Sequence, residues 1–479
     1  MIRRMNEVGG KIASKWIEDN KAYLAEINDK IWEFAEVGLQ EFKSAELLAQ
    51  ELEKSGFKVE RAVAGMPSAF VATWGEGRPK IGFLAEYDAL PHLSQKVSTK
   101  KEPVKEDAPG HGCGHNTYGA AVLGTVIGLK QEMEEKKLKG TIVFYGCPAE
   151  ETLVGKVFMA RDGLFDDLDC ALTWHPMMFN TGWYSTSNAM NSVKFTFYGR
   201  SAHAAGNPEQ GRSALDAVEL MNVGVNFLRE HVISDARIHY VITKGGGEPN
   251  VVPAEAQSWY YVRAPRREDV DHIFERVVKI AQGAALMTET EMKMEILVAC
   301  YNMLPNTVLT DLMYEAMQEV GPPVWTEEEI QFAKELTDTF APGQKETVFR
   351  TWGIPMNLFD KYLDDQITPP YDRGRLLAGS TDVSDVSWIT PTAQITTCCA
   401  PLGAAFHAWQ VVATSGHSIA HKGLVLAAKS MAIAGSRLLQ SPDVLEKARE
   451  EFNTATAGKP YVCKMPKEAK PPLDQLPKH

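Results

Sequence analysis

The chain has 479 residues, of which 44% are hydrophobic and 23% charged. These values are ordinary for globular proteins of two or three domains, and they exclude disordered, collagen-like and coiled-coil classes. The 50 Lys and Arg residues are outnumbered by 62 Asp and Glu residues, giving a net charge of −12. Because this charge repels phosphate backbones and anionic lipids, we expect neither nucleic acid nor a membrane surface as partner.

Several features favour the cytoplasm. The longest nearly apolar stretches, 118–129 and 423–433, are shorter than the roughly 18 to 20 residues of a membrane span. The basic N-terminus has no apolar segment behind it, as a secretory signal would. The seven cysteines are an odd, scattered set without Asn-x-Ser/Thr acceptors, so we expect free thiols in a reducing compartment.

The first part of the chain predicts an α/β fold. Leu24, Ile27, Ile31 and Phe34 have helical spacing, and the first 56 residues look mostly helical. Short apolar runs then alternate with helical segments, and the runs cover residues 69–74, 81–85, 141–145 and 170–174. This alternation predicts a mainly parallel mixed sheet covered by helices, with ligands bound outside the carboxyl ends of its strands.

A second domain is predicted inside the first. From residue 189 the pattern is strand, helix, strand, strand, helix, strand, which is typical of a ferredoxin-like α+β domain. Longer helices and the apolar run 395–403 then return. We therefore predict a large domain at 1–188 and 305–479, interrupted by an inserted domain at 189–304. The charged segment 94–110 and the tail after Gly458 are predicted loops.

The most informative motif is HGCGHN, which contains Cys113 and His115. In an extended segment, side chains two residues apart leave the same side and can share a metal ion. A bare Cys-x-His is more often a buried cysteine beside a surface histidine. The motif therefore needs support from other parts of the chain.

Two further strand ends supply that support. Glu150 and Glu151 directly follow the run 141–145 and its YGCPA extension, and His175 ends the run 170–174. A metal ion lowers the pKa of bound water, and a free carboxylate can then accept its proton during attack on a carbonyl. An acidic pair is commonly a solvated helix start, and a lone histidine is commonly a core residue. Together, however, these N, O and S donors suit Zn²⁺ or Mn²⁺.

Other chemistries have less support. Gly245 to Gly247 lacks the following Lys and Ser/Thr of a phosphate-binding loop, and we interpret it as a turn. No Gly-x-Ser-x-Gly motif is present. Cys113 could act as a nucleophile beside a histidine, but this alternative leaves the paired carboxylates and His175 without a role.

The motifs HGCGHN, PAEE and TWHP, in this order and with an inserted domain, resemble those of the aminoacylase and carboxypeptidase family of co-catalytic metallopeptidases, in particular its amidohydrolase branch. AEYDALP, GRSAHAA, PNVVPAEAQ and STDVSDVSW extend the resemblance over nearly the whole chain. The resemblance implies two divalent metal ions, Mn²⁺ or Zn²⁺. It also implies roles for six residues: Cys113, His115, Glu151 and His175 as ligands, Glu150 as general acid/base, and Asp88 as the residue that orients a ligand.

Family members take one more histidine ligand from the C-terminal part of the chain. His407 is our prediction from its spacing after the apolar run and before the last long helix, with His421 and then His417 as alternatives. The family's usual Asp after Cys-Gly-His is Asn116 here, so we expect metal affinity or the geometry around the ligands to differ from the family pattern.

The resemblance also assigns roles to the inserted domain. It implies that this domain forms the dimer contact and that His203 stabilises the oxyanion in a partner's active site. Asn250 and Arg263 match positions that hold the substrate carboxylate in glutamate-releasing relatives, and Arg suits bidentate recognition of a carboxylate. Alternatively, Asn250 caps a turn and Arg263 is a solvent-facing charge.

We therefore predict a metal-dependent amidohydrolase that cleaves a small N-acyl amino acid, with an aroyl-glutamate as the first candidate substrate. A dipeptidase or an auxin-conjugate-type hydrolase is the alternative within the same enzyme class. The alternative from another class is a non-catalytic protein that supports a related catalytic chain. We expect a homodimer, or a hetero-oligomer with a homologous chain.

Overall fold

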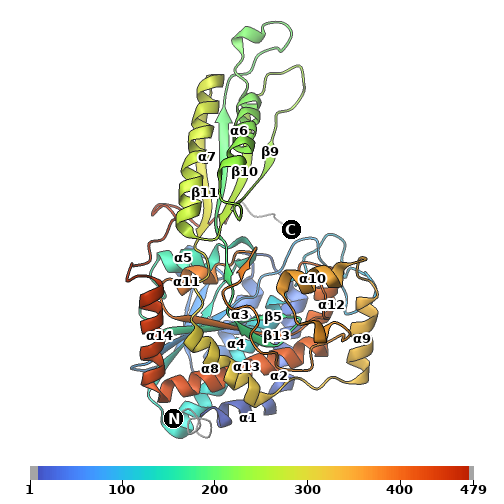
Figure 1. Ribbon diagram of the computed structural model, residues 1–479, viewed down its shortest axis with the longest axis vertical. Coiled ribbons are helices and arrows are strands. Elements are labelled where there is room, and N and C mark those ends of the chain that lie inside the picture. The colour runs from blue at the N-terminus through green and yellow to red at the C-terminus, as the bar shows by residue number, and fades with distance from the viewer. Residues whose placement is uncertain (1–8, 474–479) are drawn as a thin grey trace.

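The structure is a computed structural model that describes residues 9–473. It has a broad body built on a large sheet and a narrow inserted domain that projects from it (Figure 1). The first eight residues, which belong to the N-terminus considered above, lie outside the described part. No helix among the described residues is long and apolar enough to cross a membrane.

The large sheet has seven strands in the order β1-β2-β4-β3-β5-β13-β6. Its central pairs β4–β3, β3–β5 and β5–β13 are parallel, whereas the pairs toward both edges are antiparallel. This arrangement confirms the predicted mixed sheet. The strand bounds are β1 Lys58–Arg61, β2 Phe70–Glu76, β3 Lys80–Ala85, β4 Gly140–Gly146, β5 Cys170–Met177, β6 Thr181–Trp183 and β13 Thr392–Cys398.

One face of this sheet is covered by two long buried helices, α4 (His115–Lys136) and α13 (Ser418–Gln440). Both are apolar on most sides because they lie between the sheet and an outer layer of helices. That layer contains α1 (Lys11–Asp19) and α2 (Lys21–Phe34), whereas α8 (Thr307–Val320) packs on the sheet itself, against β13 and β6 and beside α13. The first and last parts of the chain therefore build one core.

The opposite face carries α5 (Gly155–Arg161) and α11 (Val383–Ser387). Alternate residues of β3 and β4 divide between the two faces: Phe83 and Phe144 join the first core, whereas Leu84 and Val143 join the second. The remaining helices of the body are α3 Phe42–Lys54, α9 Glu327–Thr337, α10 Gln344–Trp352, α12 Trp409–Ser415 and α14 Pro442–Ala455.

The inserted domain is a four-stranded antiparallel sheet in the order β11-β8-β10-β9, with two helices packed on it. Its bounds are β8 Ala189–Tyr198, α6 Ala214–Leu228, β9 Arg237–Lys244, β10 Glu255–Ala264, α7 Arg267–Thr288 and β11 Glu291–Cys300. The predicted ferredoxin-like element order is thus present. Since β8 and β11 begin and end this unit, we propose the domain limits 1–188, 189–304 and 305–479.

A short ribbon joins the two domains. β7 (Thr186–Ser187) pairs in parallel with β12 (Leu376–Leu377), immediately before the chain enters β8. The segment that follows β12 leads to Asp382 and α11 on the body. The ribbon therefore links the base of the inserted domain to the sheet edge that carries the candidate site.

Candidate metal centre

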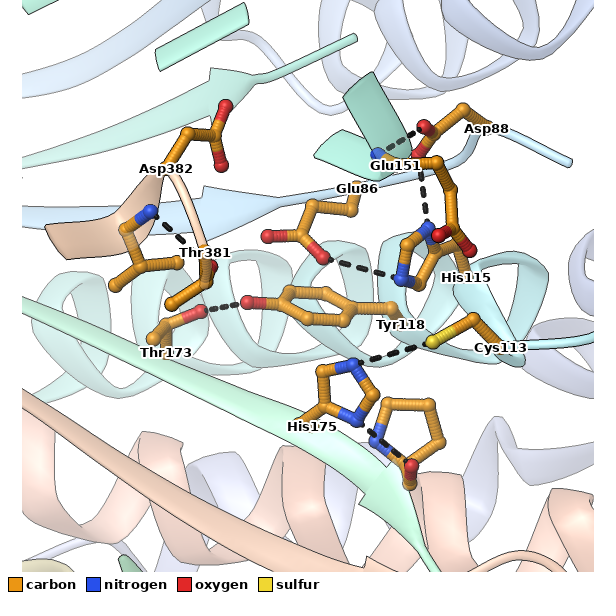
Figure 2. A network of polar contacts seen from close by, with 12 residues as sticks. Glu86, Asp88, Cys113, His115, Tyr118, Glu151, Thr173, His175, Thr381 and Asp382 are labelled. Atoms are coloured by element: carbon orange, nitrogen blue, oxygen red, sulfur yellow. Dashed lines mark hydrogen bonds and ion pairs between the residues drawn. The ribbon is translucent and has the colours of Figure 1, made fainter. Parts of the chain in front are cut away.

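Polar side chains gather at the carboxyl edge of the four central strands, as the α/β pattern predicts. Each comes from a segment that follows or ends a strand. Glu86 and Asp88 follow β3, Glu150 and Glu151 follow β4, and His175 lies in β5. Cys113 and His115 come from the start of α4, and Figure 2 shows them directed toward the same space as His175 and Glu151.

The local structure of the Cys113–His115 segment differs from the predicted extended form. Gly114 has a left-handed backbone with φ 78°, and α4 begins at His115. The two side chains still meet, because Cys113, His115 and His175 each present a ligand atom within 4.8 Å of the others. Cys113 Sγ lies 3.6 Å from His175 Nε2. The expectation of an extended segment was therefore wrong, whereas the expected juxtaposition is present.

In both His115 and His175, one ring nitrogen forms a hydrogen bond within the protein. Nδ1 of His115 lies 2.8 Å from Asp88 Oδ1, and Nδ1 of His175 lies 2.8 Å from the carbonyl oxygen of Pro176. Since these oxygens accept, each Nδ1 carries a proton, and a metal ion would bind at Nε2. This is how metal-binding histidines are commonly oriented.

Glu150 and Glu151 lie in a short 3₁₀ helix, Glu150–Thr152. Their side chains leave the backbone in different directions because successive residues of such a helix are rotated by about 120°. The backbone N–H of Glu151 donates to Asp88 Oδ2 at 2.9 Å. Asp88 therefore contacts both the His115 and the Glu151 segments.

Among the three C-terminal histidines, the geometry favours His407. Its Nε2 lies 3.3 Å from Glu151 Oε2, and Cys113, Glu151 and His407 form a second group with ligand atoms within 4.8 Å. His421 instead pairs with Asp29 at 2.8 Å. His417 caps α13 and stacks on Phe332 at 4.2 Å between ring centroids.

Burial has the largest effect on four groups of this cluster, whereas at His115 it is outweighed by Cys113 and Asp88, which raise the pKa of that imidazole well above 6.5. Burial raises the pKa of the Cys113 thiol and of Glu150, and it raises the pKa of Glu151 to about 8 although His115 opposes the change. It lowers the pKa of His175 to about 3. A bound cation stabilises a thiolate, a carboxylate and a neutral imidazole, so it would favour the ligand form of each group.

The described residues fit two divalent ions. Nε2 of His115 and Oε1 of Glu151 are buried without a hydrogen-bond partner among the described residues. Such buried polar atoms are rare unless a ligand or ion satisfies them. The two groups of ligand atoms share Cys113, so its sulfur lies close to the other donors of both groups.

Comparison with known proteins identifies the family. Residues 186–288 match the model of the peptidase dimerisation domain. One subunit of the p-aminobenzoyl-glutamate hydrolase of Escherichia coli is 44% identical over 467 residues, which are 95% of this chain and 97% of that protein. The chain belongs to the M20 family of metallopeptidases. The family predicted from the motifs is thereby confirmed, and this M20 protein is a metal-dependent hydrolase.

Two further similarities are more distant. The second subunit of the Escherichia coli p-aminobenzoyl-glutamate hydrolase is 28% identical over 304 residues, covering 53% of this chain and 69% of its own. The crystal structure of a dinuclear metal-binding M20 peptidase from Bacillus subtilis has a TM-score of 0.58 at 16% identity, covering 88% of this chain and 99% of the other. This structural likeness confirms the fold.

A cavity of about 480 Å³ opens from the candidate metal centre of this M20 protein. Its lining includes Cys113, Glu150, Glu151, His175 and His407. Aromatic side chains and two arginines complete the wall, and these are Trp183, Trp352, Phe406, Arg263 and Arg375. The candidate metal ligands and a substrate-sized space therefore share one cavity.

The substrate-binding residues predicted in the inserted domain are divided between two places. Arg263 lines the cavity of its own chain, and its Nε is buried without a hydrogen-bond partner among the described residues. His203 and Asn250 lie together in the loops before α6 and before β10, where Ala204 N donates to the carbonyl oxygen of Asn250 at 2.9 Å. Neither of these two residues lines the cavity.

Sequence reasoning missed a buried charged group behind the centre. Lys156, Glu86 and Asp382 are at most 1% exposed, and Lys156 forms an ion pair with each of the two carboxylates. Glu86 lies in the quoted motif AEYDALP, so its neighbour Asp88 could have indicated it. No sequence signal indicates Lys156, because its partners come from distant parts of the chain.

Proposed function

We propose that this M20 enzyme hydrolyses the amide bond of N-aroyl amino acids, with p-aminobenzoyl-glutamate as the first candidate. The observation that carries this proposal is the single cavity that joins the candidate metal ligands to an aromatic wall and an arginine. The 44% identity to a p-aminobenzoyl-glutamate hydrolase of Escherichia coli over almost the whole chain supports the same substrate.

The aromatic wall suits the acyl side of such a substrate. Ring centroids of His175 lie 6.2 Å from Trp183 and 6.1 Å from Phe406, and Trp183 lies 6.0 Å from Trp352 in an edge-on arrangement. Aromatic rings prefer offset or edge-to-face neighbours at such distances. An aroyl group held here would have its carbonyl carbon beside the candidate metal ligands.

Arg263 suits the carboxylate of the amino-acid side. Its guanidinium lies over the ring of Tyr261, 5.4 Å from the centroid, and its buried Nε remains available as a donor. A guanidinium can bind a carboxylate through two parallel hydrogen bonds. We propose that Arg263 anchors a substrate carboxylate in this way, and that Asn250 reaches the cavity of a second chain.

The proposed mechanism uses Glu150 as the proton carrier. Cys113, His115, Glu151, His175 and His407 would hold the two ions, which acidify water and polarise the amide carbonyl when bound. Glu150 takes a proton from the attacking water and transfers it to the leaving nitrogen as the C–N bond breaks. We propose that His203 donates a hydrogen bond to the oxyanion of the tetrahedral intermediate in the cavity of a second chain.

The proposal includes the metal and the assembly. Mixed Cys, His and Glu donors accept Mn²⁺ or Zn²⁺, and we propose Mn²⁺ or Zn²⁺ as the native metal. Exposed apolar side chains on β9 and α6, including Val241 and Phe227, favour a homodimer through the inserted domain. Both Escherichia coli relatives are named as subunits of one hydrolase, which makes a hetero-oligomer the alternative. We place the protein in the cytoplasm, as the sequence indicates.

Product release by purified protein tests this function. Metal-free protein, loaded with Mn²⁺ or with Zn²⁺, is mixed with p-aminobenzoyl-glutamate, and release of glutamate is measured. N-acetyl-glutamate and simple dipeptides serve as comparisons. We expect metal-dependent turnover that is fastest with the aroyl substrate. Metal-loaded protein that cleaves dipeptides but not aroyl amino acids would contradict the proposal.

A further inference from the structure

A buried lysine lies behind the candidate metal centre. Lys156 is the second residue of α5, and its Nζ lies 2.6 Å from Glu86 Oε1 and 2.6 Å from Asp382 Oδ1. Asp382 also accepts the backbone N–H of Lys156 at 2.7 Å. We call Lys156, Glu86 and Asp382 the lysine clamp. Figure 2 shows Glu86 between Asp382 and the ring of His115.

The charge of Lys156 is stable in this buried place. Burial alone lowers the pKa of an ammonium group, but Asp382 and Glu86 more than offset this effect and raise the pKa of Lys156 well above 10.5. A buried cation held by two carboxylates fixes the positions of both, because moving either one leaves a charge unpaired.

The clamp uses only one oxygen of Glu86. The other oxygen, Oε2, is buried without a hydrogen-bond partner among the described residues, and it lies 3.4 Å from Nε2 of His115. Nε2 of His115 likewise has no hydrogen-bond partner in that part of the chain. Nε2 of His115 and Oε2 of Glu86 therefore face each other at ion-pair distance inside the protein, and a divalent cation bound at Nε2 would take the place of a proton there.

Glu150 lies in the same space. Glu86, His115 and Glu150 each present an atom within 4.8 Å of the others. The carboxylate of Glu86 and the imidazole nitrogen of His115 are suitable donors for a hard or borderline divalent ion, and Glu150 lies beside them as the proposed proton carrier. Glu86 is thus as near to the metal-binding nitrogen of His115 as a second ligand of the same ion would be.

We propose that Glu86 is a further acidic group of the metal centre. Lys156 binds one oxygen of Glu86 and thereby holds the other oxygen toward an ion bound at His115. The inference rests on the proposed function only in requiring that the centre binds divalent metal. Asp382 holds Lys156 from the other side, so the clamp also connects the centre to the cavity-lining segment that ends at Thr381.

Metal titrations of three proteins test the role of Glu86. Glu86→Gln keeps the size of the side chain and an acceptor for Lys156 but removes the charge. Asp385→Asn is the matched control, because Asp385 is an equally buried carboxylate of α11 that bonds Tyr461 and Tyr301 instead. Mn²⁺ affinity of metal-free protein is measured by calorimetry, and the Mn²⁺-induced rise in Tm is measured alongside.

We expect Glu86→Gln to bind Mn²⁺ at least about tenfold more weakly than the wild type and to gain less Tm from the metal. Asp385→Asn should lower the Tm of the metal-free protein and leave Mn²⁺ affinity unchanged. Wild-type affinity in Glu86→Gln would overturn the proposal. Because these titrations need no substrate, failure of the wild type to cleave an aroyl amino acid would contradict the proposed function alone.

A double variant tests whether Lys156 holds Glu86 in position. Lys156→Met combined with Asp382→Asn removes one charge of each sign, so Glu86 stays charged while its support is lost. We expect the same weakening of Mn²⁺ binding, and wild-type affinity would overturn the role of Lys156. If this protein does not fold, Asp382→Asn alone takes its place. It keeps Glu86 and its charge but removes the charge of the other carboxylate that holds Lys156, and it is judged by the same two outcomes.

Discussion

Asp88 accepts a hydrogen bond from Nδ1 of His115 at 2.8 Å, and both side chains are fully buried. The other oxygen of the same carboxylate accepts the backbone N–H of Glu151 at 2.9 Å. One side chain thus orients two candidate ligands that come from different elements. This explains why a strand-end aspartate that contacts no substrate space is integral to the site.

Asp88→Asn should therefore weaken metal binding. An amide presents only one acceptor oxygen, so it can serve His115 or Glu151 but not both. We expect metal affinity to fall by about 10- to 100-fold, as for other partners of metal-binding histidines. Metal content after dialysis against a weak chelator measures the effect. Unchanged content would show that the His115 ring is held by other contacts.

Glu150→Gln should separate metal binding from catalysis. In our mechanism Glu150 carries the proton, and the amide cannot do so. We expect the variant to retain both ions and to lose about 10²- to 10⁴-fold in kcat. Metal analysis and steady-state rates on one preparation provide the measurement. Appreciable turnover with full metal content would rule out Glu150 as the acid/base.

Cys113→Ser should reduce metal occupancy, because a hard hydroxyl would replace a soft sulfur ligand that belongs to both groups of candidate ligand atoms. We expect at least about a tenfold loss of affinity, comparable with or larger than the loss caused by an orienting residue. Cys170→Ser is the matched control, since Cys170 is also buried but begins β5 at the end of the strand away from the site. Equal metal content in the two variants would contradict the assignment of Cys113.

The sequence predicted those parts of the fold that depend on local pattern. The apolar run 81–85 lies within β3, Lys80–Ala85, because a central strand buried on both faces must be apolar throughout. The alternating segments after residue 188 form the inserted sheet. Only one face of that sheet is covered by helices, so its strands alternate between apolar and polar residues. Here periodicity alone distinguished two kinds of strand.

Prediction failed where the structure depends on the backbone conformation of one residue or on partners that are distant in the sequence. Gly114 takes a left-handed conformation, so His115 starts a helix where an extended segment was expected. Lys156 could not be interpreted from sequence, because its charge is satisfied by Asp382, 226 residues away. His407, by contrast, was predicted from its spacing after a strand. The structure brings its Nε2 to 3.3 Å from Glu151 Oε2, although the two residues are far apart in the chain.

Trp352→Ala should discriminate between acyl groups. Trp352 forms part of the cavity wall and packs edge-on against Trp183. We expect KM for p-aminobenzoyl-glutamate to rise about tenfold, corresponding to about 1.4 kcal/mol of lost ring contact, with a much smaller change for N-acetyl-glutamate. Trp74→Ala in β2, outside the cavity, is the matched control. An equal rise in KM for both substrates would contradict an aryl subsite.

Asp364 should make stability depend on pH. It is fully buried and accepts the backbone N–H groups of Asn180 at 2.8 Å and Gln366 at 3.1 Å, yet burial raises its pKa from 3.8 to about 7. A carboxyl with a raised folded pKa binds its proton more tightly in the folded state, so its proton-linked stabilisation is complete below about pH 3.8 and is lost as the pH rises through 7. Asp364→Asn cannot titrate. Between pH 5 and pH 8 the wild type should therefore lose about 2 kcal/mol of unfolding free energy relative to the variant, measured by urea denaturation of both proteins. A difference between the two proteins that stays constant over this range would show that Asp364 is ionised in the folded protein throughout.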